Sequence, residues 1–173
     1  SFGFLSTDEM MILFGYYYLG DSPSAVPLSI QEGWNLVGLP FEYDDTSVES
    51  IFPESILGTL YQFDGAYSST TELEFGNGYW LYFDEPVSTV LSGIAVETNV
   101  VNLMEGWNLI SGISTSMSVD QIYDPQNIIV SGTVYGFIVT YFQSEILFPG
   151  KGYWVNANQN GSVMLSLNEG RNK

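Results

Sequence analysis

The chain has 173 residues, of which 45% are hydrophobic and 16% aromatic, and this composition predicts a folded protein with a substantial core. Twenty acidic residues against three basic ones give a formal net charge of −17, which repels phosphate backbones and excludes nucleic acid as a partner. Because the chain has no histidine and no cysteine, histidine triads, thiolate nucleophiles, disulfides and Cys- or His-ligated metal sites are excluded. Carboxylate chemistry and oxygen-ligated cations such as calcium remain.

The amino-terminal segment, residues 1–26, is strongly apolar. Ser6 and Glu9 have the spacing of a capping box, and a Gly-Asp-Ser-Pro stop at 20–23 completes a predicted helix over 7–19. This helix is too short to span a bilayer, which needs about 20 apolar residues, so the β-modules or another subunit would have to bury it. We expect the segment to be an assembly arm, either a helix or a strand donated to a neighbouring copy. Its apolar residues are Met10, Met11, Leu13, Phe14, Tyr16, Tyr17, Tyr18 and Leu19.

A second interpretation of the same segment concerns calcium. From Gly3 to Glu9 a glycine, an aliphatic residue and a glutamate have the spacing of positions six, eight and twelve of a calcium loop. The segment thus resembles the second half of a dockerin-type calcium repeat. The early ligand positions would precede Ser1, and position five is Phe2, so no calcium binding is predicted there.

The rest of the chain is an internal duplication, with one copy at residues 27–98 and the other at 99–173. A Gly-Trp-Asn-Leu block opens each copy, and a Gly-x-Gly-Tyr-Trp block follows later. The paired blocks, in chain order, are 33–37 with 106–110, 47–52 with 118–123, 58–63 with 132–137, and 76–80 with 150–154.

Each copy has the pattern of short strands separated by turns. Aromatic and β-branched runs bounded by Gly, Pro, Asp and Asn predict strands, and one helical turn after Ser47 and after Ser118 is expected. The fold class is therefore all-β: two tandem small β-sandwich or barrel-like modules with a short amino-terminal helix or donor segment. The predicted strands are 28–39, 59–63, 78–83 and 87–91, then 100–113, 128–142, 152–156 and 162–167.

The repeated glycines and aromatic residues have physical interpretations. Gly33 and Gly106 each follow a glutamate and are expected at positive φ in a tight turn. The tryptophans could stack on the C–H face of a pyranose, but equivalent tryptophans in two strand-rich copies favour a core role. The predicted repeat core is Trp34, Leu36, Tyr61, Tyr79, Trp80, Trp107, Leu109, Tyr135, Tyr153 and Trp154.

These blocks resemble a tandem module of large secreted and cell-surface proteins of bacteria and archaea. The resemblance covers residues 28–167 and implies a small, noncatalytic all-β module. The second copy departs from the first after its opening block, with Ile-Ser-Thr at 113–115 where the first has Leu-Pro-Phe at 39–41.

Other polar features are few. Asp44-Asp45 and Asp84-Glu85 could suggest a glycosidase pair, but adjacent carboxylates rarely converge across a groove, so solvated turns are favoured. Weak calcium binding at Asp44 and Asp45 is an alternative. Asn160 begins the Asn-Gly-Ser glycosylation sequon.

The sequence therefore predicts a noncatalytic, extracellular or cell-surface structural subunit that assembles with copies of itself into a filament or layer. It predicts no enzyme activity, no cofactor and no membrane-spanning segment. The alternative is a carbohydrate-binding or adhesion module of a larger secreted protein, with glycans as partners.

Overall fold

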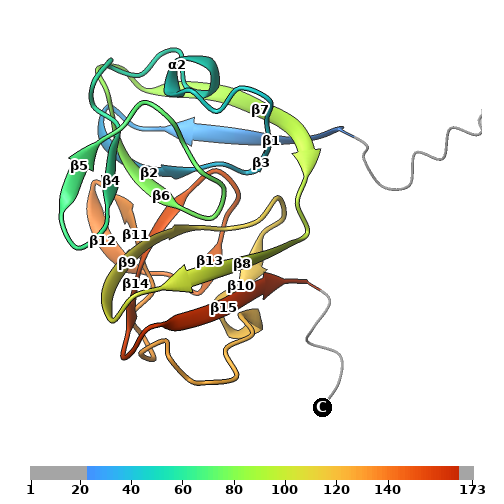
Figure 1. The fold of residues 1–173 in the computed structure, drawn as a ribbon. Helices are drawn as coiled ribbons and strands as arrows, with labels where there is room; N and C mark the ends of the chain where they lie inside the picture. The colour runs from blue at the N-terminus through green and yellow to red at the C-terminus, as the bar shows by residue number, and fades with distance from the viewer. Residues whose placement is uncertain (1–22, 168–173) are drawn as a thin grey trace, which may run out of the picture.

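A computed structural model describes residues 23–167 of the chain, and the fold of this part is all-β (Figure 1). The predicted arm helix at 7–19 and all the arm residues lie outside the described part. The first strand begins at Pro23, inside the range expected to be arm and linker. Within residues 23–167 no helix has the length and apolar character needed to cross a bilayer.

The strands fall into two sets, which we call module 1 and module 2. Module 1 consists of β1 (Pro23–Ile30), β2 (Gly33–Gly38), β3 (Phe41–Glu42), the helical turn α2 (Val48–Ile51), β4 (Tyr61–Phe63), β5 (Tyr67–Ser69), β6 (Gly78–Phe83) and β7 (Val87–Ala95). Module 2 consists of β8 (Thr98–Leu103), β9 (Gly106–Ser111), β10 (Met117–Ser118), the 3-10 turn η1 (Val119–Gln121), β11 (Tyr135–Ile138), β12 (Thr140–Gln143), β13 (Ile146–Leu147), β14 (Gly152–Ala157) and β15 (Gly161–Ser166).

The two modules repeat the same antiparallel topology. Module 1 has a four-stranded sheet in the order β2-β6-β4-β5, and module 2 has the equivalent sheet β9-β14-β11-β12. Strands β1, β7 and β3 form the second sheet of module 1, while β8 with β15 and β10 with β13 form two smaller sheets of module 2. The duplication of the sequence is therefore a duplication of the fold.

The Gly-Trp-Asn block forms a tight turn with its own hydrogen bonds. Gly33 has φ +92°, as expected, and the turn divides the predicted strand 28–39 into β1 and β2. The side chain of Asn35 donates to the carbonyls of Gln31 and Gly33 and accepts from the Gln31 N–H, so this buried amide replaces the missing ladder bonds. Asn108 makes the same three bonds in module 2.

The expected helical turns are also present, as α2 and η1. They differ at their first residue. The Ser118 side chain accepts a hydrogen bond from the Asp120 N–H and forms a capping box with Gln121, whereas Ser47 makes no side-chain cap. In module 1 the Asp45 carboxylate instead accepts from the Ser47 N–H, at 3.0 Å.

Alternation along the strands gives the four-stranded sheets two apolar faces. In β6, Tyr79, Leu81 and Phe83 are fully buried in the core of module 1, while Trp80 and Tyr82 point to the other face. Module 2 has its own core of buried residues from its three sheets. The second face of each large sheet is directed at the other module, where Leu36, Leu109 and Trp154 form a third buried cluster.

The modules pack through contacts that are reciprocal. Val37 of module 1 forms a β-bridge with Lys151 of module 2, and Ile110 of module 2 forms the equivalent bridge with Asn77 of module 1. Ile110 corresponds to Val37 in the repeat, and Asn77 corresponds to Lys151. Such an exchange of partners means that a pseudo-twofold axis relates the two modules.

Candidate functional site

Two open clefts lie where each module meets the other, and aromatic rings line both. Their volumes are about 450 Å³ for the cleft that we call cleft A and 510 Å³ for cleft B, within the usual range of ligand sites. Cleft A is lined by Trp34, Tyr61, Tyr67, Trp80 and Phe137. Cleft B is lined by Phe63, Tyr67, Trp107, Tyr135, Tyr141 and Trp154.

Trp34 and Trp107 are not core residues, so the prediction that they are buried is wrong. Their exposed fractions are 43% and 45%, and each ring forms one wall of a cleft. The physical reason lies in the strand: Trp34 alternates with Asn35, and only the asparagine side of β2 faces the interior of module 1 at that position.

The neighbouring rings hold the two tryptophans in matching positions. The Trp34 ring centroid lies 5.9 Å from that of Tyr61 and 6.4 Å from that of Trp80. The Trp107 centroid lies 6.1 Å from that of Tyr135 and 6.4 Å from that of Trp154. Tilted and edge-to-face pairs of this kind fix the rings while leaving one indole surface open.

The rest of the predicted repeat core divides into two groups. Five of its members are buried as expected: Leu36, Tyr79, Leu109, Tyr153 and Trp154. The other three are half-buried and line the clefts: Tyr61, Trp80 and Tyr135.

Each cleft takes rings from both modules. The β4–β5 hairpin of module 1 places the ring centroid of Phe63 4.9 Å from that of Trp154 in module 2. The β11–β12 hairpin of module 2 places the ring centroid of Phe137 4.8 Å from that of Trp80 in module 1. In Figure 1 these two hairpins lie next to one another along one side of the molecule. A single module would therefore provide only part of either cleft.

Tyr67 and Tyr141 stand where the clefts adjoin. They are equivalent in the repeat, and their exposed fractions are 55% and 52%. The pKa of the Tyr141 hydroxyl is raised, chiefly by burial and then by the nearby Tyr67 hydroxyl, and the Trp154 indole N–H opposes this shift. That indole N–H is buried, and it has no other hydrogen-bond partner within residues 23–167. The clefts thus carry tyrosine hydroxyls at their shared rim.

Among residues 23–167, no charged side chain lines either cleft. Within residues 23–167, no three acidic side chains gather in a group that could hold a metal ion. Asp45 is exposed and its pKa is lowered by hydrogen bonds from Ser47, so this carboxylate serves the turn before α2. Asp84 and Glu85 are exposed in the turn between β6 and β7. The chemistry that the clefts offer is ring stacking and hydroxyl hydrogen bonding.

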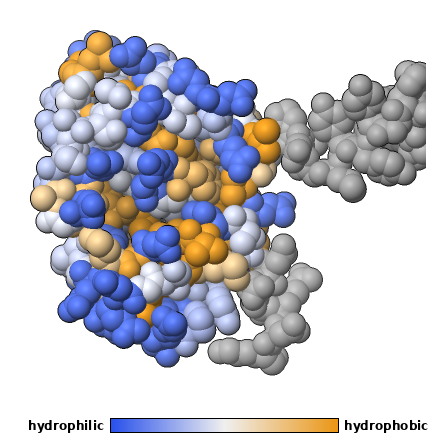
Figure 2. All heavy atoms as spheres, viewed as in Figure 1, coloured by the Kyte–Doolittle hydropathy of each residue, from blue (hydrophilic) through white to orange (hydrophobic). Residues whose placement is uncertain are grey.

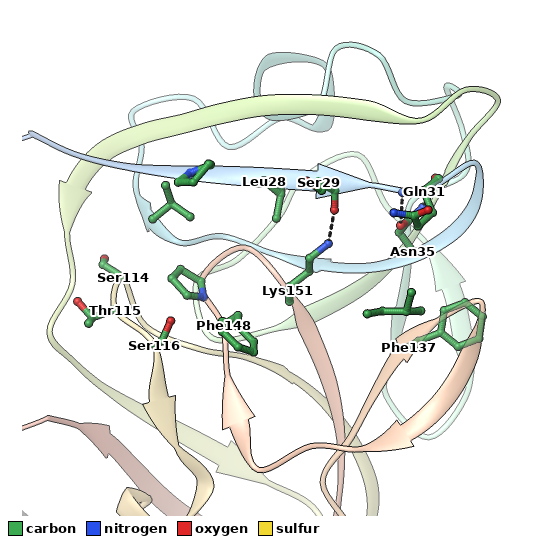
Figure 3. A pocket seen from close by; sticks show the side chains of 14 residues that line it. Leu28, Ser29, Gln31, Asn35, Ser114, Thr115, Ser116, Phe137, Phe148 and Lys151 are labelled. Atoms are coloured by element: carbon green, nitrogen blue, oxygen red, sulfur yellow. Dashed lines mark hydrogen bonds between the residues drawn. The ribbon is translucent and has the colours of Figure 1, made fainter.

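A more polar hollow of about 590 Å³ lies on another part of the boundary between the modules (Figure 3). The Lys151 ammonium donates a 2.6 Å hydrogen bond to the carbonyl of Ser29, joining the turn before β14 to β1. Burial lowers the pKa of this amine. Hydroxyls of Ser114, Thr115 and Ser116 line the opposite wall, and the Ser114 hydroxyl is already bonded to the carbonyl of Pro40. These contacts tie the modules together.

The glycosylation sequon is exposed. Asn160 lies in the turn between β14 and β15, and its side-chain oxygen accepts a 2.7 Å hydrogen bond from the Glu105 N–H. The residue as a whole is exposed.

Comparison of the chain with protein-family models, with curated proteins and with solved structures finds no match. The site and its chemistry consequently rest on the geometry of the described residues.

Proposed function

We propose that the protein is a noncatalytic module of an extracellular or cell-surface protein that binds neutral glycans through clefts A and B. The observation that carries the proposal is the pair of half-exposed indoles, Trp34 and Trp107, each held in an open cleft by other aromatic rings. A flat apolar ring complements the C–H face of a pyranose, and tyrosine hydroxyls at the rim can bond the equatorial hydroxyls of the sugar.

The charge of the clefts favours a neutral ligand. A formal net charge of −17 repels anionic polymers, and the cleft linings formed by the described residues contain no amine or guanidinium to offset that repulsion. Acidic glycans and phosphorylated partners therefore fit poorly. Proline-rich peptides also pack on aromatic grooves, so binding of such a peptide in place of a polysaccharide is the competing hypothesis.

Affinity electrophoresis tests the proposal with gels containing cellulose ether, mannan, xylan, amylose or laminarin. At least one neutral polysaccharide should retard the protein, and Trp34→Ala together with Trp107→Ala should abolish the retardation. Tyr123→Ala is the matched control, because this ring has a similar exposed fraction, 48%, and lies outside both clefts. Binding of a proline-rich peptide with no retardation by any polysaccharide would overturn the proposal.

A second candidate, self-assembly at the cell surface, is favoured by the tip of the β11–β12 hairpin. Val139 occupies φ +64° with 78% exposure, and Ile138 beside it is 58% exposed. The equivalent position in module 1 is Gly65, at φ +73°. A β-branched residue in left-handed backbone, at an exposed apolar turn next to the edge strand β12, is a costly feature that an interaction with a second copy would explain.

Val139→Gly tests this second candidate. Because the substitution relieves a backbone cost of roughly 1–2 kcal/mol, it should leave the protein as stable or more stable while weakening association. Sedimentation velocity over a range of concentrations measures that association. Equal association of the variant and the wild type would contradict a role for the tip.

A further inference from the structure

The axis that relates the modules emerges between the two clefts. Residues that lie beside their own repeat equivalents mark its path. Gly38 faces Ser111, and a Cβ added at Gly38 would come within 2.2 Å of the Ser111 Cβ. At the other end of the path, Tyr67 and Tyr141 both line cleft B, and the Tyr67 hydroxyl is near enough to raise the pKa of Tyr141.

The hydrophobic interior along this path belongs to both modules. Leu36 and its equivalent Leu109 lie in the same buried cluster. On the face shown in Figure 2, hydrophobic residues gather across the middle of the molecule, while hydrophilic ones cover much of the two ends. The modules thus form one body, with clefts A and B adjoining on either side of the axis at Tyr67.

This symmetry has a consequence for a directional ligand. A half-turn about an axis that emerges between two clefts reverses the direction of any line lying across the surface. A glycan has a reducing and a non-reducing end, so a chain that makes the same contacts in both clefts must run in opposite directions in the two. Stacking tolerates either direction, but hydrogen bonds from rim hydroxyls to particular sugar hydroxyls do not.

We propose that the molecule holds two separate glycan chains in antiparallel directions, one in cleft A and one in cleft B, and so cross-links them. This inference rests on the proposed function and specifies how its two clefts divide the ligand. One chain crossing both clefts would meet the second in the reversed direction and lose its hydrogen bonds there.

The two exposed indoles differ by one supporting ring, which sets an order of affinity for the clefts. The Trp34 centroid lies 5.3 Å from that of Tyr82, but the residue equivalent to Tyr82 in module 2 is Asn156. Cleft A therefore holds its exposed indole with one more aromatic partner than cleft B. It should bind the same oligosaccharide more tightly, because a better-ordered platform loses less side-chain entropy on binding.

Calorimetry with hexasaccharides tests whether each cleft binds its own glycan chain. The probes are cellohexaose, mannohexaose, xylohexaose, maltohexaose and laminarihexaose, one for each polymer used in the electrophoresis. The binding hexasaccharide should show two sites per chain. Trp34→Ala and Trp107→Ala should each leave one, with the weaker remaining site in Trp34→Ala.

Turbidity with the soluble polymer of the same sugar tests the cross-linking. The wild type should cluster the polymer, and each single-cleft variant should bind it without clustering. Clustering by a single-cleft variant would show that self-association, not paired clefts, joins the chains.

Three results separate this inference from the proposed function. One hexasaccharide per chain, lost in both single variants, would mean that one glycan crosses both clefts; the inference fails and the glycan function stands. Two sites without clustering would overturn cross-linking alone. No binding of any hexasaccharide or polymer would overturn the function itself.

Discussion

At the scale of single residues, a tyrosine hydroxyl closes the same turn in both modules. The Tyr79 oxygen accepts a hydrogen bond from the Glu74 N–H, and the Tyr153 oxygen accepts one from the Phe148 N–H, each at 2.8 Å. Both rings are buried. The Tyr of the Gly-x-Gly-Tyr-Trp block therefore secures the turn that precedes it, while the Trp after it faces the opposite side of the strand.

Tyr153 makes the stability of the protein sensitive to alkali. Burial raises its pKa from 10.0 to about 12, so the folded state holds the proton more tightly than the unfolded state. Its contribution is fully present below pH 10 and is lost as the pH rises from about 10 to 12. Tyr153→Phe should cost about 1 kcal/mol at neutral pH, because the Phe148 N–H loses its acceptor, but should flatten the alkaline decline.

Urea unfolding at a series of pH values from 7 to 12 measures both effects of Tyr153→Phe. Tyr79 has a pKa raised in the same direction, again mainly by burial, so some alkaline decline should remain in the variant. An identical slope in the variant and the wild type above pH 10 would contradict this account.

Trp34→Ala separates a cleft residue from a core residue. With 43% of the ring exposed, the substitution should lower the free energy of unfolding by less than about 2 kcal/mol, against about 3–5 for a buried tryptophan. Leu36→Ala, two residues along the same face of β2 but 3% exposed, should cost about 2–5 kcal/mol. Urea unfolding measures the loss of free energy of unfolding in each variant. An equal loss in both would show that Trp34 is a core residue.

Turn conformations could be predicted from the sequence more reliably than the sheet face to which each strand residue points. Turn glycines such as Gly33 and Gly106 depend on a few neighbouring residues, and the predicted positive φ is confirmed. The repeat pattern predicts Tyr79 and Trp80 in one core, although adjacent strand residues point to opposite faces. This alternation in the sequence could have indicated the packing of the two modules. A strand that is apolar on both faces must be covered on both, and here its own module covers one face and the other module covers the second.

At the scale of elements, strands β2 and β9 pack closely at the axis because their equivalent last residues differ in size. Gly38 ends β2 and Ser111 ends β9, and these equivalent positions meet side by side. The N–H of Gly38 donates to the Gly150 carbonyl, and the N–H of Ser111 donates to the Gly76 carbonyl. One small side chain fits between the strands, and two do not.

A swap of residues at the axis tests this fit. Gly38→Ser should destabilise the protein by about 1–3 kcal/mol, because its Cβ would overlap the Ser111 Cβ. Adding Ser111→Gly moves the single hydroxymethyl group to the other side of the axis and should restore most of the loss. Denaturant unfolding of the two variants gives the comparison; no cost for Gly38→Ser alone would contradict the close approach.

At the scale of the whole molecule, the clefts exist only because two modules are fixed at one angle. The duplication and the all-β class followed from repeated blocks and strand punctuation, which the sequence states directly. Composite clefts could not be predicted from it, since they depend on which sheet faces meet. That choice is made by small details such as the glycine at position 38 and the Lys151 bond to Ser29.

Salt should affect the stability of the protein and its affinity for glycans differently, because the whole molecule is highly charged but its clefts are neutral. A net charge of −17 produces self-repulsion that salt screens, so raising sodium chloride from about 20 mM to about 500 mM should raise the melting temperature. Glycan affinity should change by less than about twofold over the same range, because no charged side chain of the described part of the chain lines either cleft. A basic peptide drawn to the acidic surface would instead bind about tenfold or more weakly at the higher salt. Calorimetry at both salt concentrations decides between them: a steep loss of affinity would show that the ligand is held by the protein's charge and not by its aromatic rings.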